Sequence, residues 1–261
     1  MSRRVRTLLF LVSAAAFAVC FALACFRLPP FGTDHHPYGT RAVAASLQQR
    51  TANVVASVTF DQRGLDTLGE EALLFAAVLG AVVLLRRARD ESAHDPERLE
   101  VAPPIGLFGA LSLPVTLLVG GYIVAHVQLT PGGGFQGGIV LATGLHLAYL
   151  AADYRVLKRV RPLATLHAAD AIAAGAFAAL GCAGLLAGGA YLENVLPLGT
   201  FGALSSAGLV PVVNVAVGVE VGSGIVVLLA HFLEQAHEMG SAGQESEKGS
   251  GGARLSSGGT R

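Results

Sequence analysis

Six long apolar stretches constrain this chain more than any other feature of its sequence. They cover roughly residues 7–26, 68–85, 105–127, 137–151, 168–189 and 212–233. An apolar helix needs about 20 residues to cross a bilayer, and most of these stretches are close to that length. The composition agrees, because 52% of the residues are hydrophobic and only 14% are charged. We therefore predict an all-α, multi-pass transmembrane protein with about six helices, located in the cell membrane.

Two of the stretches have unusual lengths or positions. The fourth, at residues 137–151, would cover only about 22 Å as a helix, so it must include part of the preceding glycine-rich loop or have one end buried in protein. The first stretch follows a cluster of three arginines near the N-terminus. It is longer than the apolar region of about 7–15 residues in a signal peptide, so we expect an uncleaved first helix.

The positions of lysine and arginine predict the orientation. Alternate connections are rich in them: three precede the first stretch, four lie in 86–98, four in 155–161 and three follow the last stretch. The other connections hold four within a long loop, and none in 128–136 or 191–211. Basic connections stay on the cytoplasmic side, so we predict that both termini are cytoplasmic. The Gly- and Ser-rich segment 237–261 is expected to be a disordered cytoplasmic tail.

An acidic motif stands at the start of the second apolar stretch. Asp66, Thr67, Glu70 and Glu71 fall within six residues there. Carboxylates near a membrane span are costly unless they are paired or hydrated, so these residues are candidates for an ion path. Alternatively, Thr67 and Glu70 have the spacing of a capping box, and acidic groups favour a helix N-terminus. The two interpretations are compatible, and the sequence leaves both open.

A glycine-rich loop separates the third and fourth stretches. Its glycines and proline cannot continue a helix, and irregular backbone at membrane depth must be buried in protein or line water. The sequence allows a hairpin turn with close helix contact or part of an ion path. A phosphate-binding loop is excluded, because no Lys-Ser/Thr follows the glycines and no strand precedes them. The loop consists of Thr130, Pro131, Gly132, Gly133, Gly134, Phe135, Gln136, Gly137 and Gly138.

Two further residues are candidates for the ion path. Glu220 lies in the middle of the last apolar stretch, where a charge is most costly. It could carry a proton or cation, or it could remain protonated and donate a hydrogen bond to a neighbouring helix. His126, at the end of the third stretch, could relay protons, but a lone histidine at a helix end more often has a packing role.

Several function classes are excluded or disfavoured. The basic residues are scattered and the net charge is zero, so no nucleic-acid partner is expected. The three cysteines show no metal-type spacing, and we expect no disulfide, no metal and no cofactor. No nucleophile and base form a recognisable pair, so we do not expect an enzyme.

The loop string LTPGGGFQGG, at residues 129–138, closely resembles the signature of the B subunit of Mrp-type (Mnh) sodium/proton antiporters. The likeness continues through residues 193–199, 205–208 and 214–218, and so implies a four-helix MnhB-like domain at 101–236. Members of this family tend to have His-Gly-His before Leu-Thr-Pro, whereas this chain has His126-Val127-Gln128. That difference weakens a proton-relay role for this position.

The front of the chain has a resemblance of its own. Residues 53–55, 60–64 and 66–70 look like the C-terminal part of the large antiporter A subunit, which is equivalent to the small E subunit of membrane-bound hydrogenases. The resemblance implies a two-helix module at 1–100 fused to the B subunit, and it ranks Glu70 above Glu220 as an ion-path residue.

Together the two resemblances imply a membrane subunit of an antiporter that exchanges Na⁺, or another monovalent cation, for H⁺. Its partners would be the other components of the antiporter complex and membrane lipid. The alternatives are a subunit of a hydrogenase or another respiratory complex related to complex I, and a membrane scaffold without an ion role.

Overall fold

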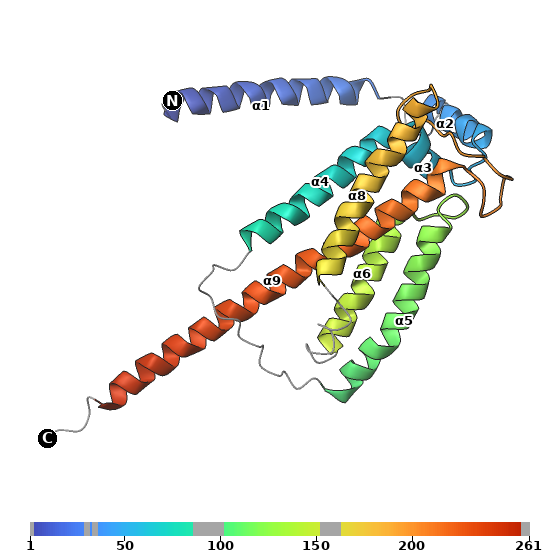
Figure 1. Ribbon diagram of the computed structural model, residues 1–261. Coiled ribbons are helices and arrows are strands. Elements are labelled where there is room, and N and C mark those ends of the chain that lie inside the picture. Colours follow the sequence, from blue (N-terminus) through green and yellow to red (C-terminus); the bar gives the residue numbers. More distant parts are fainter. Residues whose placement is uncertain (1–2, 29–31, 33–35, 86–101, 152–162, 257–261) are drawn as a thin grey trace. The chain divides into compact units, whose positions relative to one another are not determined.

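The computed structural model describes residues 3–28, 32, 36–85, 102–151 and 163–256, with the side chains of 149–151 and 234–256 left aside. All regular structure in these residues is helical, which confirms the all-α prediction (Figure 1). The chain divides into two units, residues 1–41 and 42–261. Each unit is described by itself.

Helix α1 (Arg3–Phe26) makes up most of the first unit. It has 24 residues, enough to extend about 36 Å, and none of them is buried. Its side chains are mostly apolar, as the first predicted stretch requires. An apolar helix without a protein core around it is suited to a lipid environment.

The second unit begins with short helices where the sequence analysis expected only a long connection. These are α2 (Pro37–Gln48), whose first residues belong to the first unit, α3 (Val54–Ser57) and the π-helical segment η1 (Val58–Gln62). Asn53 caps α3, because its side-chain oxygen accepts hydrogen bonds from the backbone of Val55 and Ala56. The connection therefore has helical structure of its own.

Five long helices follow. They are α4 (Gly64–Leu84), α5 (Pro103–Ala125), α6 (Gly134–Ala151), α8 (Leu163–Leu186) and α9 (Leu209–Ser256). α9 packs against each of the other four, so it is the central helix of the bundle. Small β-branched side chains on α9 form much of the core, among them Val213, Val217 and Val221, each no more than 1% exposed.

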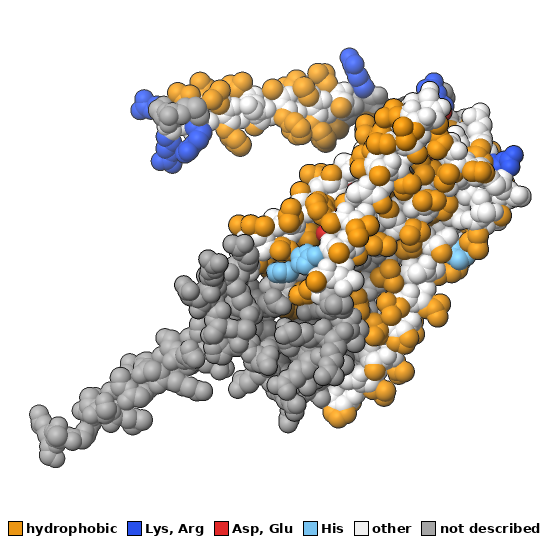
Figure 2. All heavy atoms as spheres, in the orientation of Figure 1, with side chains coloured by type: hydrophobic (Ala, Val, Ile, Leu, Met, Phe, Trp, Pro, Cys, Tyr) orange, Lys and Arg blue, Asp and Glu red, His pale blue; other side chains and the backbone are white. Residues whose placement is uncertain are grey.

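Five of the described helices are long and apolar enough to cross a membrane: α1, α4, α5, α8 and the segment Leu209–Leu233 of α9. The fourth predicted stretch corresponds to α6, which has 18 residues and is not among these five. As its length required, α6 begins inside the glycine loop, at Gly134. Figure 2 shows hydrophobic side chains covering the described part of the bundle on the face in view.

The C-terminal segment differs from the prediction. α9 continues to Ser256, whereas the sequence indicated a disordered tail from residue 237. Glycine and serine are poor helix formers, but extending an existing helix costs far less than nucleating a new one. The division at residue 100 falls outside the described residues, and this boundary and the orientation of the termini remain predictions.

Candidate functional site

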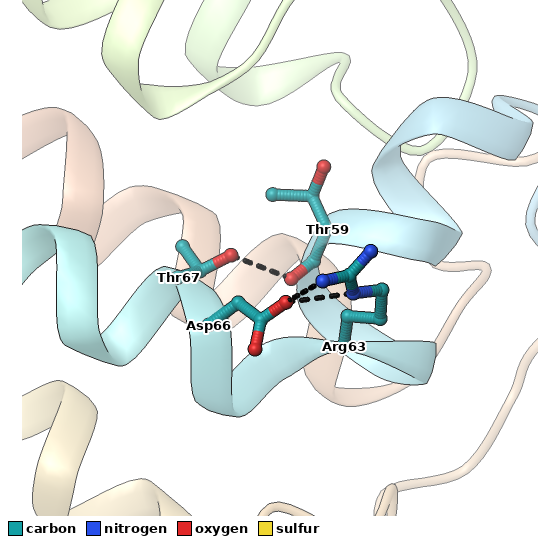
Figure 3. A network of polar contacts seen from close by, with 4 residues as sticks. All are labelled: Thr59, Arg63, Asp66 and Thr67. Carbon is teal, nitrogen blue, oxygen red and sulfur yellow. Dashed lines mark hydrogen bonds and ion pairs between the residues drawn. The ribbon is translucent and has the colours of Figure 1, made fainter. Parts of the chain in front are cut away.

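The acidic motif lies in the first turns of α4 but does not cap the helix. α4 begins at Gly64, and the preceding residue, Arg63, makes no side-chain capping bond. The Thr67 hydroxyl instead donates a hydrogen bond of 2.7 Å to the carbonyl of Thr59 (Figure 3). The capping-box interpretation of Thr67 and Glu70 is therefore wrong, because the helix starts three residues before Thr67.

Asp66 is engaged at the surface. Its Oδ2 atom accepts a hydrogen bond of 2.6 Å from Nε of Arg63, and the two side chains form an ion pair (Figure 3). Both remain more than half exposed. Such pairs contribute about 0–1 kcal/mol, so this contact is a local surface feature and does not place Asp66 inside the bundle.

Glu70 and Glu71 have opposite environments although they are adjacent. Successive helical residues point about 100° apart, so only one of the two can face the bundle interior. Glu70 is exposed, while Glu71 is 1% exposed. The structure thus places Glu71 in the interior, and not the residue that the family resemblance ranked first.

The Glu71 side chain meets Glu220 from α9, which is fully buried. The two carboxyl groups interact electrostatically, and no hydrogen-bond donor among the described residues reaches any of their four oxygen atoms. A third carboxyl group, that of Asp170 on α8, is 3% exposed and interacts electrostatically with both glutamates. We call Glu71, Glu220 and Asp170 the acidic cluster.

A glycine brings the three helices together at the acidic cluster. Gly224 lies one turn after Glu220, and a Cβ atom placed on it would be 3.1 Å from Oδ1 of Asp170 and 3.3 Å from Val78 on α4. Glu220 follows Leu209, where α9 begins, by eleven residues, or about 17 Å. The cluster therefore lies near the middle of the span Leu209–Leu233.

Unpaired carboxylates are costly at this depth. A charged acidic side chain near the centre of a bilayer costs at least about 2.5 kcal/mol, and like charges in contact add repulsion. Among the described residues no basic side chain pairs with the cluster, and no three His, Cys, Asp or Glu side chains form a metal-binding group. The arrangement is suited to holding a proton between the glutamates, or a monovalent cation in its place.

The glycine loop connects α5 to α6 and is fixed by Asn214 of α9. The backbone N–H of Gly134 donates to Oδ1 of Asn214 at 2.5 Å, and the amide nitrogen of Asn214 donates to the Val124 carbonyl at 2.7 Å. Within the loop, Gly132 has a φ of 123°, which side chains rarely allow. One buried amide thus joins the end of α5 to the start of α6.

Glycines allow α6 and α9 to pack closely. A Cβ atom on Gly134 would lie 2.6 Å from the Asn214 carbonyl oxygen, and one on Gly138 would lie 2.9 Å from the Gly218 oxygen and from the Gly222 nitrogen. The spacing of four residues on each helix is the small-residue pattern of membrane helix contacts. The loop therefore has the geometry of a hairpin with close helix contact, one of the two interpretations left open by the sequence.

A cavity of about 280 Å³ brings Glu70 next to this loop. Its lining includes Glu70, Thr59 and Phe60 on one side and loop residues Gly132 to Gln136 on the other. The two motifs that the sequence singled out separately are therefore neighbours in the fold. The shared cavity leaves an ion-path role for Glu70 open, because it has room for water or a cation beside the Glu70 carboxylate.

A second cavity, of about 430 Å³, lies beside η1 and the segment that precedes α9. Asp61, Tyr191 and Asn194 are among its lining residues. Burial raises the pKa of Asp61, although a hydrogen bond with Asn194 acts in the opposite direction. Burial also raises the pKa of Tyr191, whose hydroxyl donates to the Ala178 carbonyl at 3.0 Å.

His126 has a local packing environment at the end of α5. Its ring stacks on Tyr122 with a centroid distance of 4.0 Å, and its Nδ1 atom lies 3.0 Å from the Tyr122 carbonyl oxygen. These contacts within one helix turn favour the packing interpretation over a relay. Asp170 was not among the predicted ion-path residues, although its position as a carboxylate in an apolar stretch was a signal for it.

Comparisons with known proteins agree with this architecture. Residues 104–227 match the model of a domain related to the MnhB subunit of Na⁺/H⁺ antiporters. An uncharacterized protein of Methanocaldococcus jannaschii is 30% identical over 202 residues, which cover 66% of this chain and 74% of the relative. A probable K⁺/H⁺ antiporter A/B subunit of Rhizobium meliloti is 28% identical over 62% of this chain, but over only 18% of its own length.

Two solved structures share the fold. A chain of the archaeal membrane-bound sulfane sulfur reductase, a respiratory membrane complex, has a TM-score of 0.66 and 27% identity, covering 88% of this chain and 98% of that one. A chain of the Mrp complex from Dietzia sp. DQ12-45-1b has a TM-score of 0.63 and 23% identity, covering 88% of this chain and 26% of that one. Residues 104–227 of this chain therefore form a domain of the family related to the MnhB subunit of Na⁺/H⁺ antiporters.

Proposed function

We propose that this chain is a membrane subunit of a multisubunit monovalent cation/proton antiporter, and that the acidic cluster forms part of its ion path. The MnhB-related domain at residues 104–227 supports the first part, together with similarity to a probable antiporter A/B subunit and to a chain of the Mrp complex. Since several of these relatives are parts of larger complexes, the chain would act in a hetero-oligomer. The proposal assigns it no catalytic reaction.

The observation that carries the second part is the contact between Glu71 and Glu220. Two buried carboxyl groups face each other with no hydrogen-bond donor among the described residues. A purely structural acid at this depth would be expected to have a donor on a neighbouring helix, because an unsatisfied carboxyl group destabilises the fold. A pair that binds and releases a proton or a cation explains why acids are present at this position.

The fusion suggested by the sequence also fits the cluster. Glu71 lies outside the matched segment 104–227, whereas Asp170 and Glu220 lie inside it. In our proposal, residues 1–100 supply the part of the path that resembles the antiporter A subunit. The two portions would then contribute one glutamate each to the central pair.

The decisive experiment measures cation/proton exchange by the whole complex in everted membrane vesicles. Glu220→Gln and Glu71→Gln keep the side-chain size but remove the exchangeable charge, so we expect exchange to fall about tenfold or more. Asp66→Asn is the matched control, because Asp66 is an exposed acid on the same helix as Glu71. It should leave exchange within about twofold of the unmodified complex, since its ion pair is weak.

Assembly must be measured in the same membranes by co-purification of the other subunits. Full exchange in both glutamate variants, with normal assembly, would refute the ion-path role and favour a scaffold. Glu70→Gln is a further arm, because Glu70 borders the loop cavity and could act at a separate point of the path.

A second candidate function is a membrane subunit of a respiratory complex that couples redox chemistry to ion movement. The structural similarity over 98% of a chain from such an archaeal complex favours it. Co-purified subunits with iron–sulfur centres would support this function. An active antiporter purified without redox subunits would exclude it.

A further inference from the structure

Two histidines meet at the end of the bundle where α8 begins. His167 on α8 and His231 on α9 have ring centroids 5.5 Å apart in an edge-to-face arrangement. Both side chains are half-buried. The pair is therefore positioned between the bundle interior and its surroundings.

His167 is in register with the acidic cluster. It precedes Asp170 by three residues on α8, and residues at this spacing lie on the same helix face about 5–6 Å apart. Asp170 is buried, and its Oδ1 atom has no hydrogen-bond partner among the described residues. A proton on the imidazole of His167 would thus have an acceptor one turn deeper in the bundle.

His231 shows a similar register on α9. Eleven residues separate it from Glu220, so the two lie on the same face of the helix, about 17 Å apart along its axis. Asp170 lies between them, because it contacts Gly224. The His231 and His167 rings are neighbours, His167 and Asp170 are one helix turn apart, and Asp170 interacts electrostatically with both glutamates.

The hydrogen bonding of His231 leaves one ring nitrogen for proton exchange. Its Nδ1 atom lies 2.9 Å from the Val227 carbonyl oxygen. A carbonyl only accepts hydrogen bonds, so Nδ1 carries the hydrogen and Nε2 presents the lone pair at which the ring gains a proton. The proton gained by the ring forms a bond to Nε2. This bond breaks when the proton moves to the next group, and the ring then returns to its neutral form.

We propose that His167 and His231 form a proton relay that connects the acidic cluster with the aqueous side at this end of the bundle. This inference rests on the proposed ion-path role of the cluster. A proton from water binds Nε2 of one imidazole, moves to the other ring and then to the Asp170 carboxylate, from which it reaches the Glu71–Glu220 pair. Chains of histidine and carboxyl groups are the usual means of proton movement within membrane spans.

Other titratable groups must be considered in a pH experiment. On the elements packed against α8 and α9, the buried or half-buried ones are Glu71 on α4, Asp61 on η1, His146 on α6 and His126 at the end of α5. Asp170 and Glu220 are the corresponding groups on α8 and α9 themselves.

The test compares His167→Gln and His231→Gln in the assembled complex, with exchange measured in everted vesicles between about pH 6 and pH 9. Without the relay, Asp170 must take protons directly from water, and that rate falls with proton concentration. We therefore expect a loss of about tenfold at the alkaline end and less than about twofold at the acidic end. Added imidazole should restore part of the alkaline activity, which a structural defect would not allow.

His126→Gln is the matched control, since His126 stacks on Tyr122 at the end of α5. It should show the same pH profile as the unmodified complex. If one relay variant fails to assemble, the other still decides the outcome. A uniform loss at all pH values without imidazole rescue would overturn the relay.

The Glu220→Gln variant separates the two proposals. Loss of exchange in Glu220→Gln, with full exchange in both histidine variants, would refute the relay and leave the proposed function intact. Full exchange in Glu220→Gln would refute the ion-path role and with it the basis of the relay.

Discussion

Replacing Gly134 by alanine tests the close contact between α6 and α9. The new Cβ atom would lie 2.6 Å from the Asn214 carbonyl oxygen and 2.7 Å from the backbone nitrogen of Gly218. Both are backbone atoms of a central helix, so a side-chain rotation cannot relieve the overlap. Overpacking of this kind costs about 1–3 kcal/mol, and we expect the upper part of that range.

The measurement is thermal unfolding of the detergent-purified complex, followed through this subunit. For a protein of this size, a loss of 1 kcal/mol lowers the melting temperature by about 2–4 °C, so Gly134→Ala should lower it by about 4–12 °C. Gly121→Ala is the matched control, because a Cβ atom there meets nothing within 4 Å. Alanine also favours the helix by up to about 1 kcal/mol over glycine, so this control should be neutral or slightly stabilising.

Equal melting temperatures for the two variants would refute the close contact. A loss in both variants would show that the effect arises from the substitution in general and not from the geometry of the α6–α9 contact. Exchange activity should fall together with stability in Gly134→Ala, because Asn214 and Glu220 lie on the same central helix.

Two further predictions concern the segments around the loop. Burial raises the pKa of Asp61 above its unfolded value of 3.8, so ionisation of its carboxyl group opposes folding. The protonated carboxyl group is fully compatible with the fold below pH 3.8, and this stability is lost as the pH rises through the pKa of the folded state. Asp61→Asn should therefore raise the melting temperature at neutral pH relative to the unmodified protein, and this difference should disappear near pH 4. An equal difference in melting temperature at the two pH values would contradict the prediction. The Asn53 amide nitrogen donates 2.8 Å hydrogen bonds to the carbonyls of Val127 and Thr130. Asn53→Asp keeps the side-chain oxygen that caps α3 but removes both hydrogen-bond donors, so the free energy of unfolding should fall by about 2 kcal/mol in a thermal unfolding experiment. An unchanged free energy of unfolding would show that these two hydrogen bonds do not hold the loop.

The helices were predictable because each must bury its backbone polar groups while presenting about 20 apolar residues to lipid. The ends were less predictable. α4 starts at Gly64, three residues before Thr67, and the Thr67 hydroxyl donates to the Thr59 carbonyl, a bond that no sequence pattern specifies. α2, α3 and η1 were missed for a similar reason, since Asn53 holds that region through bonds to residues more than 70 positions away.

The acidic cluster could be predicted only in part. The burial of Glu220 followed from its place in an apolar stretch, whereas the choice between Glu70 and Glu71 depends on the rotation of α4 about its own axis. That rotation is set by packing against α8 and α9, so it cannot be predicted from the sequence motif alone. The same holds for Asp170, whose role emerges only when Gly224 brings α8 to the level of Glu220.

The contact of Glu71 with Glu220 joins parts of the chain that are 149 positions apart, one outside the MnhB-related segment and one inside it. Neither part alone can complete the pair. A misdocked α4 would leave Glu220 with no acid opposite it and, on our proposal, with no proton to share. On this proposal, transport depends on the folding of the chain: before α4 docks on α9 there is no conducting centre, and the membrane is protected from an uncoupled leak.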